Sequence, residues 1–197
     1  MLATGDTDIY LIDQIQRGRI RPNMRLLDAG CGTGRNAEYF VRNNYDFFGI
    51  DAREEAIQEA RRRIQGWNPH FDIGKFRVAD VARIPFPDDH FDFIISSAVL
   101  HFAADRAQFT VLMEEMLRVL APGGTLWIRM TAKHTIEHLA QHLHDDVYRL
   151  PDGSTRYLLD RDYLSEWMEK HGLSFADPFK TVNVSDVRTM AVVVLRV

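Results

Sequence analysis

The chain has 197 residues, of which 26% are charged, and a formal net charge of −4. This composition is ordinary for a globular protein and gives no electrostatic reason to expect a nucleic acid or an anionic membrane as partner. No uncharged apolar run approaches the roughly 18 residues of a membrane span, and the N-terminus lacks the basic and apolar regions of a signal peptide. The single cysteine, Cys31, cannot form an internal disulfide, which fits the reducing cytoplasm. The length fits one domain, so we expect a single cytoplasmic domain over residues 1–197.

Apolar periodicity alternates between two types along most of the chain. The N-terminal segment 1–22 is expected to contain an amphipathic helix that lies over the ligand site as a lid. Short apolar runs bounded by turn residues predict buried strands at 24–29, 46–51, 75–80, 91–97 and 124–130. Helical spacing predicts helices between them, at 36–44, 54–65 and 105–120. This alternation indicates parallel strands with right-handed crossovers and helices on both faces.

The C-terminal part has a different pattern. Residues 160–172 predict a capped helix that ends at Gly172, and two strands follow at 173–184 and 187–197. Their link at Ser185–Asp186 is too short for a crossover, so the two strands must pair in antiparallel fashion. We therefore expect an α/β fold with a doubly wound, seven-stranded, mostly parallel sheet that contains one antiparallel strand.

A glycine-rich turn, Asp28-x-Gly30-x-Gly32-x-Gly34, lies between the first strand and the first helix after it. Such a turn lets backbone N–H groups approach a polar or anionic ligand at the carboxyl ends of the strands. Asp51 ends the second strand, where a carboxylate can accept hydrogen bonds from both hydroxyls of a ribose. Arg35 occupies the position where a dinucleotide fingerprint needs glycine or alanine, and the Asp28 carboxylate would repel a pyrophosphate. A nicotinamide-dependent oxidoreductase is therefore disfavoured.

These motifs resemble those of the Rossmann-like (class I) S-adenosylmethionine-dependent methyltransferases of the small-molecule type. "LLDAGCGTGRN" is similar to the first motif of that family and "GIDAREEAI" to the second. "VADVARIPFPDDHFDFIISSAVLHF" resembles the third and fourth motifs, and "MLRVLAPGGTLWIR" resembles the helix, turn and fifth strand. The resemblance implies the strand order 3-2-1-4-5-7-6 and S-adenosyl-L-methionine as cofactor.

The resemblance also implies a role for individual residues. Asp51 would hold the ribose, Asp80 the adenine amino group, and the glycine loop with Asp28 the methionyl part of the cofactor. "SSAVLH" replaces the Asn/Asp-Pro-Pro-Tyr of enzymes that methylate DNA bases, which favours a small-molecule acceptor. The residues expected to bind the cofactor are Asp28, Gly30, Cys31, Gly32, Gly34, Asn36, Asp51, Ala52, Asp80, Val81, Ser96, Ser97 and Leu100.

His101 is the candidate catalytic residue because it follows the fourth strand, on the side expected to face the transferred methyl group. A hydroxyl acceptor would need such a general base, whereas an anionic or soft nucleophile needs chiefly positioning and a dry pocket. The alternative is a histidine that hydrogen-bonds a neighbouring loop.

The segment 131–160 is expected to be variable and to cover the substrate. Within it "HTIEH" matches the H-x-x-E-H zinc motif, and His134, His138 and His142 would lie on one face of a helix. We favour a polar lid helix without metal, because a five-letter match arises easily by chance. A hairpin around Pro-Asp-Gly could close the acceptor site and bind an acidic substrate through arginine, or be an ordinary surface hairpin. The substrate candidates are Tyr10, His134, Tyr148, Arg149 and Arg156.

Tyr10 is included as a possible lid residue, although an aromatic that simply packs an amphipathic helix is the commoner case. The leading hypothesis is a methyltransferase that acts on a small-molecule acceptor. The alternative is a non-catalytic S-adenosylmethionine-binding regulatory or partner-activated protein, which would keep Asp51 and Asp80 but lack a formed acceptor pocket. Neither the accepting atom nor the oligomeric state is selected by the sequence, because function in this fold depends on the segments grafted onto it.

Overall fold

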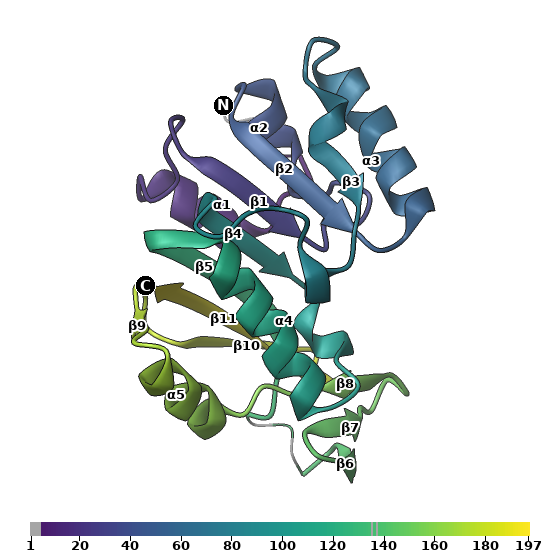
Figure 1. Ribbon diagram of the computed structural model, residues 1–197. Helices are drawn as coiled ribbons and strands as arrows, with labels where there is room; N and C mark the ends of the chain where they lie inside the picture. The colour runs from purple at the N-terminus through teal and green to yellow at the C-terminus, as the bar shows by residue number, and fades with distance from the viewer. Residues whose placement is uncertain (1–4, 135, 137) are drawn as a thin grey trace.

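A computed structural model describes residues 5–134, 136 and 138–197 and shows a twisted sheet flanked by helices (Figure 1). The strand order is β3-β2-β1-β4-β5-β11-β10, with β9 paired to β11, which confirms the predicted order. The strands of this sheet are β1 (Arg25–Ala29), β2 (Asp46–Asp51), β3 (Phe76–Val78), β4 (Phe91–Ser97), β5 (Leu120–Ala132), β9 (Ser174–Phe175), β10 (Lys180–Val184) and β11 (Arg188–Arg196). The helices are α1 (Ile9–Gln16), α2 (Glu38–Arg42), α3 (Glu54–Trp67), α4 (Arg106–Val119) and α5 (Arg161–Lys170), with short 3-10 turns η1 (Ile73–Lys75), η2 (Val81–Arg83) and η3 (Leu100–Phe102).

The direction of each strand follows from the length of its connection. Strand β1 pairs in parallel with both β2 and β4. Helix α2 provides the crossover from β1 to β2, and α3 provides the crossover from β2 to β3. Strand β11 pairs antiparallel with β5 and with β10, since only the turn around Ser185 and Asp186 separates β10 from β11. Both turn residues have left-handed backbone conformations, with φ of 53° and 56°. A tight hairpin of this kind leaves no room for a crossover.

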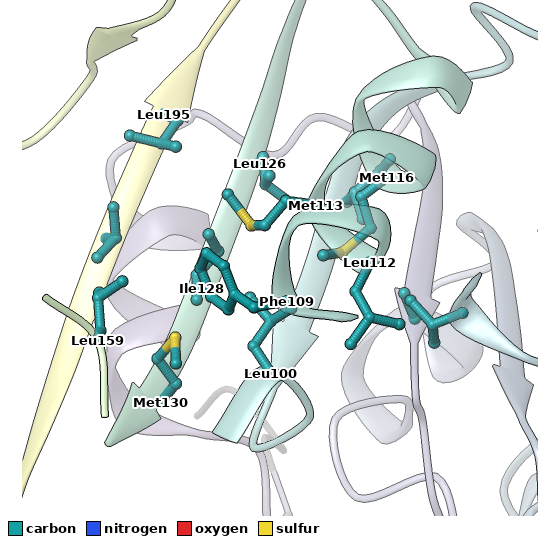
Figure 2. Close-up of a cluster of buried hydrophobic side chains, with 14 of the residues drawn as sticks. Leu100, Phe109, Leu112, Met113, Met116, Leu126, Ile128, Met130, Leu159 and Leu195 are labelled. Atoms are coloured by element: carbon teal, nitrogen blue, oxygen red, sulfur yellow. The ribbon is translucent and has the colours of Figure 1, made fainter. Parts of the chain in front are cut away.

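Helices cover both faces of the sheet and bury two apolar clusters. One cluster lies under α4 and α5, where Phe109 and Met113 pack on Ile128 of β5 (Figure 2). The other cluster lies under α1, α2 and α3 and includes Phe40 and Trp127. The periodic apolar stripes of the helices therefore match the strands that they cover. None of the helices in the described part of the chain has both the length and the hydropathy that a membrane crossing requires.

Strand β5 begins earlier than the expected 124–130. Leu120 already pairs with Phe91, and the register with β4 then shifts before Phe93 pairs with Thr125. The shift accommodates Pro122 and Gly123, the latter with a positive φ of 75°. The Ala-Pro-Gly-Gly turn is thus an irregularity inside the strand rather than a loop in front of it.

The histidine-rich segment is not the predicted polar lid helix. Residues 141–157 form a separate antiparallel sheet of β6 (Gln141–His144), β7 (Val147–Arg149) and β8 (Thr155–Tyr157). His142 lies in β6, so His134, His138 and His142 do not share one helical face; Thr135 and Glu137 of the motif lie outside the described residues. Asp145, with φ of 44°, makes the tight turn from β6 to β7. The turn imposes a strand period on residues whose spacing by itself also fits a helix.

Candidate active site

A cleft of about 1010 Å³ opens at the carboxyl ends of the central strands. Its size is that of a ligand site, and its position is where ligands bind in doubly wound sheets. The structure brings eleven of the predicted site residues to its lining: Gly30, Cys31, Gly32, Asn36, Asp51, Ala52, Asp80, Val81, Ser97, His101 and Arg156.

The glycine loop after β1 has a backbone that side chains would obstruct. Gly30 has φ of 85°, and a Cβ atom there would lie 2.3 Å from Cγ2 of Val99. Gly32, with φ of 55°, would present its Cβ to nothing closer than an Arg53 nitrogen at 3.9 Å, so it leaves open space at the cleft. Gly34 does not line the cleft; its φ is 80° and its Cα packs against Ala60 of α3. Gly34 therefore shapes the loop from behind.

Asp51, at the end of β2, is held in place by backbone hydrogen bonds. Its Oδ2 accepts a hydrogen bond from the Gly32 backbone N–H at 2.9 Å, and its Oδ1 accepts one from the Arg53 backbone N–H at 3.0 Å. The Arg53 Nε also donates to Oδ1 at 3.3 Å. Each carboxylate oxygen can accept more than one hydrogen bond, so lone pairs stay available for a ligand. These hydrogen bonds fix the orientation of the carboxylate at the cleft.

Asp80 follows β3 and is the N-cap of the 3-10 turn η2. Its Oδ1 accepts from the Ala82 backbone N–H at 2.8 Å, and the buried Val81 lies beside it in the lining of the cleft. A planar ring could lie on Val81 while its amino group donates to the free oxygen of Asp80.

Asp28 is completely buried behind the glycine loop and does not itself line the cleft. Neither carboxylate oxygen has a hydrogen-bond partner among the described residues. Burial raises the pKa of Asp28 to about 7, although the nearby positive charge of Arg35 and the amide of Asn36 act in the opposite direction. An additional cation near the loop would favour the charged form.

Cys31, also in the loop, is a buried free thiol. Burial is the main cause that raises the pKa of this thiol well above its usual value. The thiol therefore stays protonated at neutral pH and serves as a small packing residue.

Sequence reasoning missed Asp8 and Arg129, which meet across the cleft. The Arg129 Nε on β5 donates to Asp8 Oδ2 at 2.9 Å, and the Asp8 backbone N–H donates to Asn36 Oδ1 at 3.2 Å. Asp8 also caps α1 by accepting from the Tyr10 backbone N–H at 2.9 Å. This N-cap pattern is visible in the sequence, but its contact 121 residues away is not. The pair ties the N-terminal helix to the site.

Tyr10 itself does not line the cleft. The Arg129 guanidinium carbon lies 4.8 Å from the centre of its ring, and the ring packs on the cluster under α1 to α3. This geometry favours the packing alternative for Tyr10. The role of segment 1–22 as a lid stays a prediction.

His101 lies in η3, directly after β4, and lines the cleft with only 7% of its surface exposed. Its Nδ1 makes no hydrogen bond to any described residue. The pKa of His101 is lowered to about 4, chiefly by burial and to a smaller extent by the positive charges of Arg156 and Arg188. The imidazole is therefore neutral at pH 7 and offers a lone pair instead of a charge.

The remaining predicted residues divide by their position. Ser97 lines the cleft, and its Oγ accepts a hydrogen bond from Arg35 Nη2 at 3.0 Å. Ser96 is buried outside the lining, since alternate residues of a strand point to opposite faces. Leu100, in η3, is also buried outside the lining. Their contact with a cofactor stays a prediction.

The predicted substrate residues separate in the same way. Arg156 enters the cleft, whereas Arg149 is exposed and Tyr148 packs near His142, with ring centres 5.0 Å apart. His134 lines a second, smaller cavity of about 340 Å³. The described residues contain no group of three His, Cys, Asp or Glu side chains placed to hold a metal ion.

Comparison with known proteins agrees with this geometry. Residues 27–128, just over half of the chain, match the model of the family described as "Methyltransferase domain". An uncharacterized methyltransferase of Bacillus subtilis is 30% identical over 57% of this chain and 45% of its own length. A fatty-acid O-methyltransferase of Mycolicibacterium smegmatis is 29% identical over 75% of this chain and 59% of its own length. The chain spans about half the length of the curated relatives that it matches.

A solved structure gives the same fold. The crystal structure of an S-adenosylmethionine-dependent methyltransferase from Methanosarcina mazei superposes with a TM-score of 0.72 at 20% identity, covering 92% of this chain and 96% of that one. The predicted family is thereby confirmed. The chain belongs to the methyltransferase domain family and has the class I fold of the S-adenosylmethionine-dependent methyltransferases.

Proposed function

We propose that this protein transfers the methyl group of S-adenosyl-L-methionine to a small-molecule acceptor. The observation that carries the proposal is one continuous cleft that joins Asp51, Asp80 and the glycine loop to His101 and Arg156. The first three fit an adenosyl ligand with a cationic amino-acid end. His101 and Arg156 are not among the residues expected to bind the cofactor, and so they leave room for a second ligand.

The residues of this chain fit the cofactor at three places. Asp51 would bind the ribose, Asp80 with Val81 the adenine, and the open backbone at Gly32 with the unpartnered Asp28 behind it the methionyl end. When bound, S-adenosylmethionine supplies an electrophilic methyl group on a sulfonium. The task of the protein is then to exclude water and to hold the acceptor in line with that methyl group.

His101 is the residue we propose to contact the acceptor. Its neutral imidazole can accept a hydrogen bond from an acceptor hydroxyl and orient it. A pKa of about 4 means that the imidazole does not titrate near neutrality, so the rate should show no His101 inflection between pH 6 and 8. An inflection in that range that disappears in His101→Gln would contradict this assignment.

The non-catalytic alternative requires that no acceptor pocket is formed. The cleft extends past the cofactor residues to η3, β8 and β11, which favours a transferase. The first experiment is calorimetric titration of S-adenosylhomocysteine and S-adenosylmethionine into the wild type and Asp51→Ala. We expect binding that weakens by about 1.5–3 kcal/mol in the variant, because charge-assisted hydrogen bonds to the ribose are lost.

Unchanged affinity in a folded Asp51→Ala would refute the ribose assignment, and no binding to the wild type would refute the cofactor. Asp80→Ala should weaken binding less, because the adenine also gains apolar contacts. Release of S-adenosylhomocysteine in the presence of an acceptor then separates a transferase from a binding protein.

A further inference from the structure

One end of the cleft is lined by residues that are not among those expected to bind the cofactor. We call it the acceptor end and define it by His101, Phe102, Arg156, Arg188 and Met190. These residues come from η3, β8 and β11, on the β5 and β11 side of the sheet. The predicted adenosine residues come from β1, β2 and the turn after β3, on the opposite side. The acceptor end is therefore positioned for a second ligand.

Two arginines place positive charge at the acceptor end. The Arg156 guanidinium donates to the Thr155 carbonyl oxygen at 2.7 Å and makes no ion pair with any described residue. Arg188 faces Asp152 at 3.7 Å, and its Nε is enclosed without a hydrogen-bond partner in the described part of the chain. Asp152 thus pairs with Arg188 alone, and Arg156 is left without an ion pair among the described residues.

Both guanidinium groups act on the same small region. Each of them opposes protonation of the buried His101 ring, and each of them also stabilises the charged form of Asp152, whose hydrogen bonds to Ser154 are the larger cause of its lowered pKa. Both arginine side chains also line the cleft together with His101, so both border the space next to this ring. An anion there would meet both.

Apolar surface continues from the arginines. The Phe102 ring is 64% exposed, and the Arg156 guanidinium carbon lies 4.8 Å from its centre. Met190 lines the cleft beside Arg188, two residues away in β11. An exposed phenylalanine at a cleft costs solvation free energy unless a ligand covers it. The surface therefore suits a ligand that is apolar apart from its charge.

We propose that the acceptor is an amphipathic carboxylate whose anionic group pairs with Arg156 and Arg188 and whose apolar body lies on Phe102 and Met190. This inference rests on the proposed function, since it concerns the second ligand of the same cleft. Arg149 provides a matched control. It lies in β7, where Arg149 pairs with Thr155 and Tyr148 with Arg156, so strand alternation turns Arg149 to the face opposite Arg156.

The test is calorimetry on protein saturated with S-adenosylhomocysteine. The probes are octanoate and benzoate, with octanamide and octylamine as neutral and cationic counterparts of the first. We expect the wild type to bind at least one carboxylate and to prefer it to its counterparts. Arg156→Gln and Arg188→Gln should each weaken that binding by about tenfold or more, which corresponds to a lost charge-assisted hydrogen bond. Arg156→Lys should retain part of the affinity, and Arg149→Gln should bind like the wild type.

Thermal unfolding of each variant and its affinity for S-adenosylhomocysteine are measured first. Failure of the wild type to bind S-adenosylhomocysteine would overturn the proposed function itself. With that binding intact, three results would each overturn the present inference: no carboxylate bound, octanamide bound as tightly as octanoate, or glutamine variants that bind like Arg149→Gln.

Discussion

The buried carboxylate of Asp146 holds the β6–β8 sheet to the rest of the fold, and its removal is the sharpest stability test of the structure. The side chain is 2% exposed and accepts from Lys133 Nζ at 2.6 Å, from Arg106 Nη2 at 2.7 Å and from the Tyr157 hydroxyl at 3.1 Å. Lys133 extends the network to Asp160 at 2.7 Å. In Asp146→Asn these donors lose their charged acceptor.

The size of the effect follows from the exposure of the partners. Breaking a fully buried ion pair costs about 3–5 kcal/mol. The partners here are less buried, with 21% of the Lys133 and 48% of the Arg106 side chain exposed, so water replaces part of the lost interaction. We expect Asp146→Asn to reduce the free energy of unfolding by about 2–3 kcal/mol, measured by urea denaturation.

Asp145→Asn is the matched control. Asp145 is 54% exposed, has only His144 as an ion-pair partner at 3.9 Å among the described residues, and has a positive φ that asparagine tolerates. It should change the free energy of unfolding by less than about 0.5 kcal/mol. Equal effects of the two substitutions would show that the network does not stabilise the fold as argued.

The pH dependence has a definite sign. Burial opposes the charge on Asp146, but hydrogen bonds from Lys133 and Arg106 outweigh it and hold the pKa below its ordinary value. The stabilisation is therefore complete above the pKa of the unfolded chain and is lost as the pH falls through the lower pKa of the folded state. The difference between wild type and Asp146→Asn should accordingly shrink in acid. Because β8 also carries Arg156, the variant should weaken carboxylate binding more than S-adenosylhomocysteine binding.

Two further predictions concern the glycine loop. Gly30→Ala combines an unfavourable φ of 85° with a 2.3 Å approach of the new Cβ to Val99. It should lower the free energy of unfolding by at least about 2 kcal/mol, measured by thermal unfolding. The control is Gly123→Ala, with φ of 75° and open space around it, which should lower the free energy of unfolding by only about 1 kcal/mol. A similar loss in both would argue against the Val99 contact. Burial raises the pKa of Asp28 to about 7, so the stability of the wild type should fall as the pH rises from about 4 through 7. The melting temperature of Asp28→Asn relative to wild type should therefore increase between pH 5 and pH 8, and a pH-independent difference would contradict the raised pKa.

Much of the fold can be predicted from local patterns in the sequence. The runs at 46–51 and 91–97 are strands with those bounds, and the link at Ser185–Asp186 is short enough to require the antiparallel pairing of β10 and β11. Asp51 is found beside Gly32 because the carboxyl ends of adjacent parallel strands meet at one edge of the sheet. These features depend on periodicity and on chain length between turns, which the sequence states directly.

The histidine segment shows where local patterns fail. Its spacing fits a helix as well as a strand, and the choice depends on hydrogen bonds to distant residues. Leu158 donates to the Asp146 carbonyl oxygen at 2.7 Å and Leu159 to that of Thr131 at 2.9 Å, so the hairpin is held against β5. Tertiary contacts of this kind override a weak local preference.

Some residues that line the cleft can be predicted from the sequence, whereas others are identified only by the tertiary structure. The sequence by itself determined the side of the cleft built from β1, β2 and the turn after β3, because each residue there follows its own strand within one motif. Only the tertiary structure decided that Asp8, Arg129 and Arg188 join it. Asp8 at the start of α1 and Arg188 in β11 lie outside the motifs, and the motif that ends at Arg129 in β5 does not show where that side chain points. The physical reason is that the adenosine side is made by local turns, whereas the acceptor end is made by side chains that meet only after the sheet is assembled.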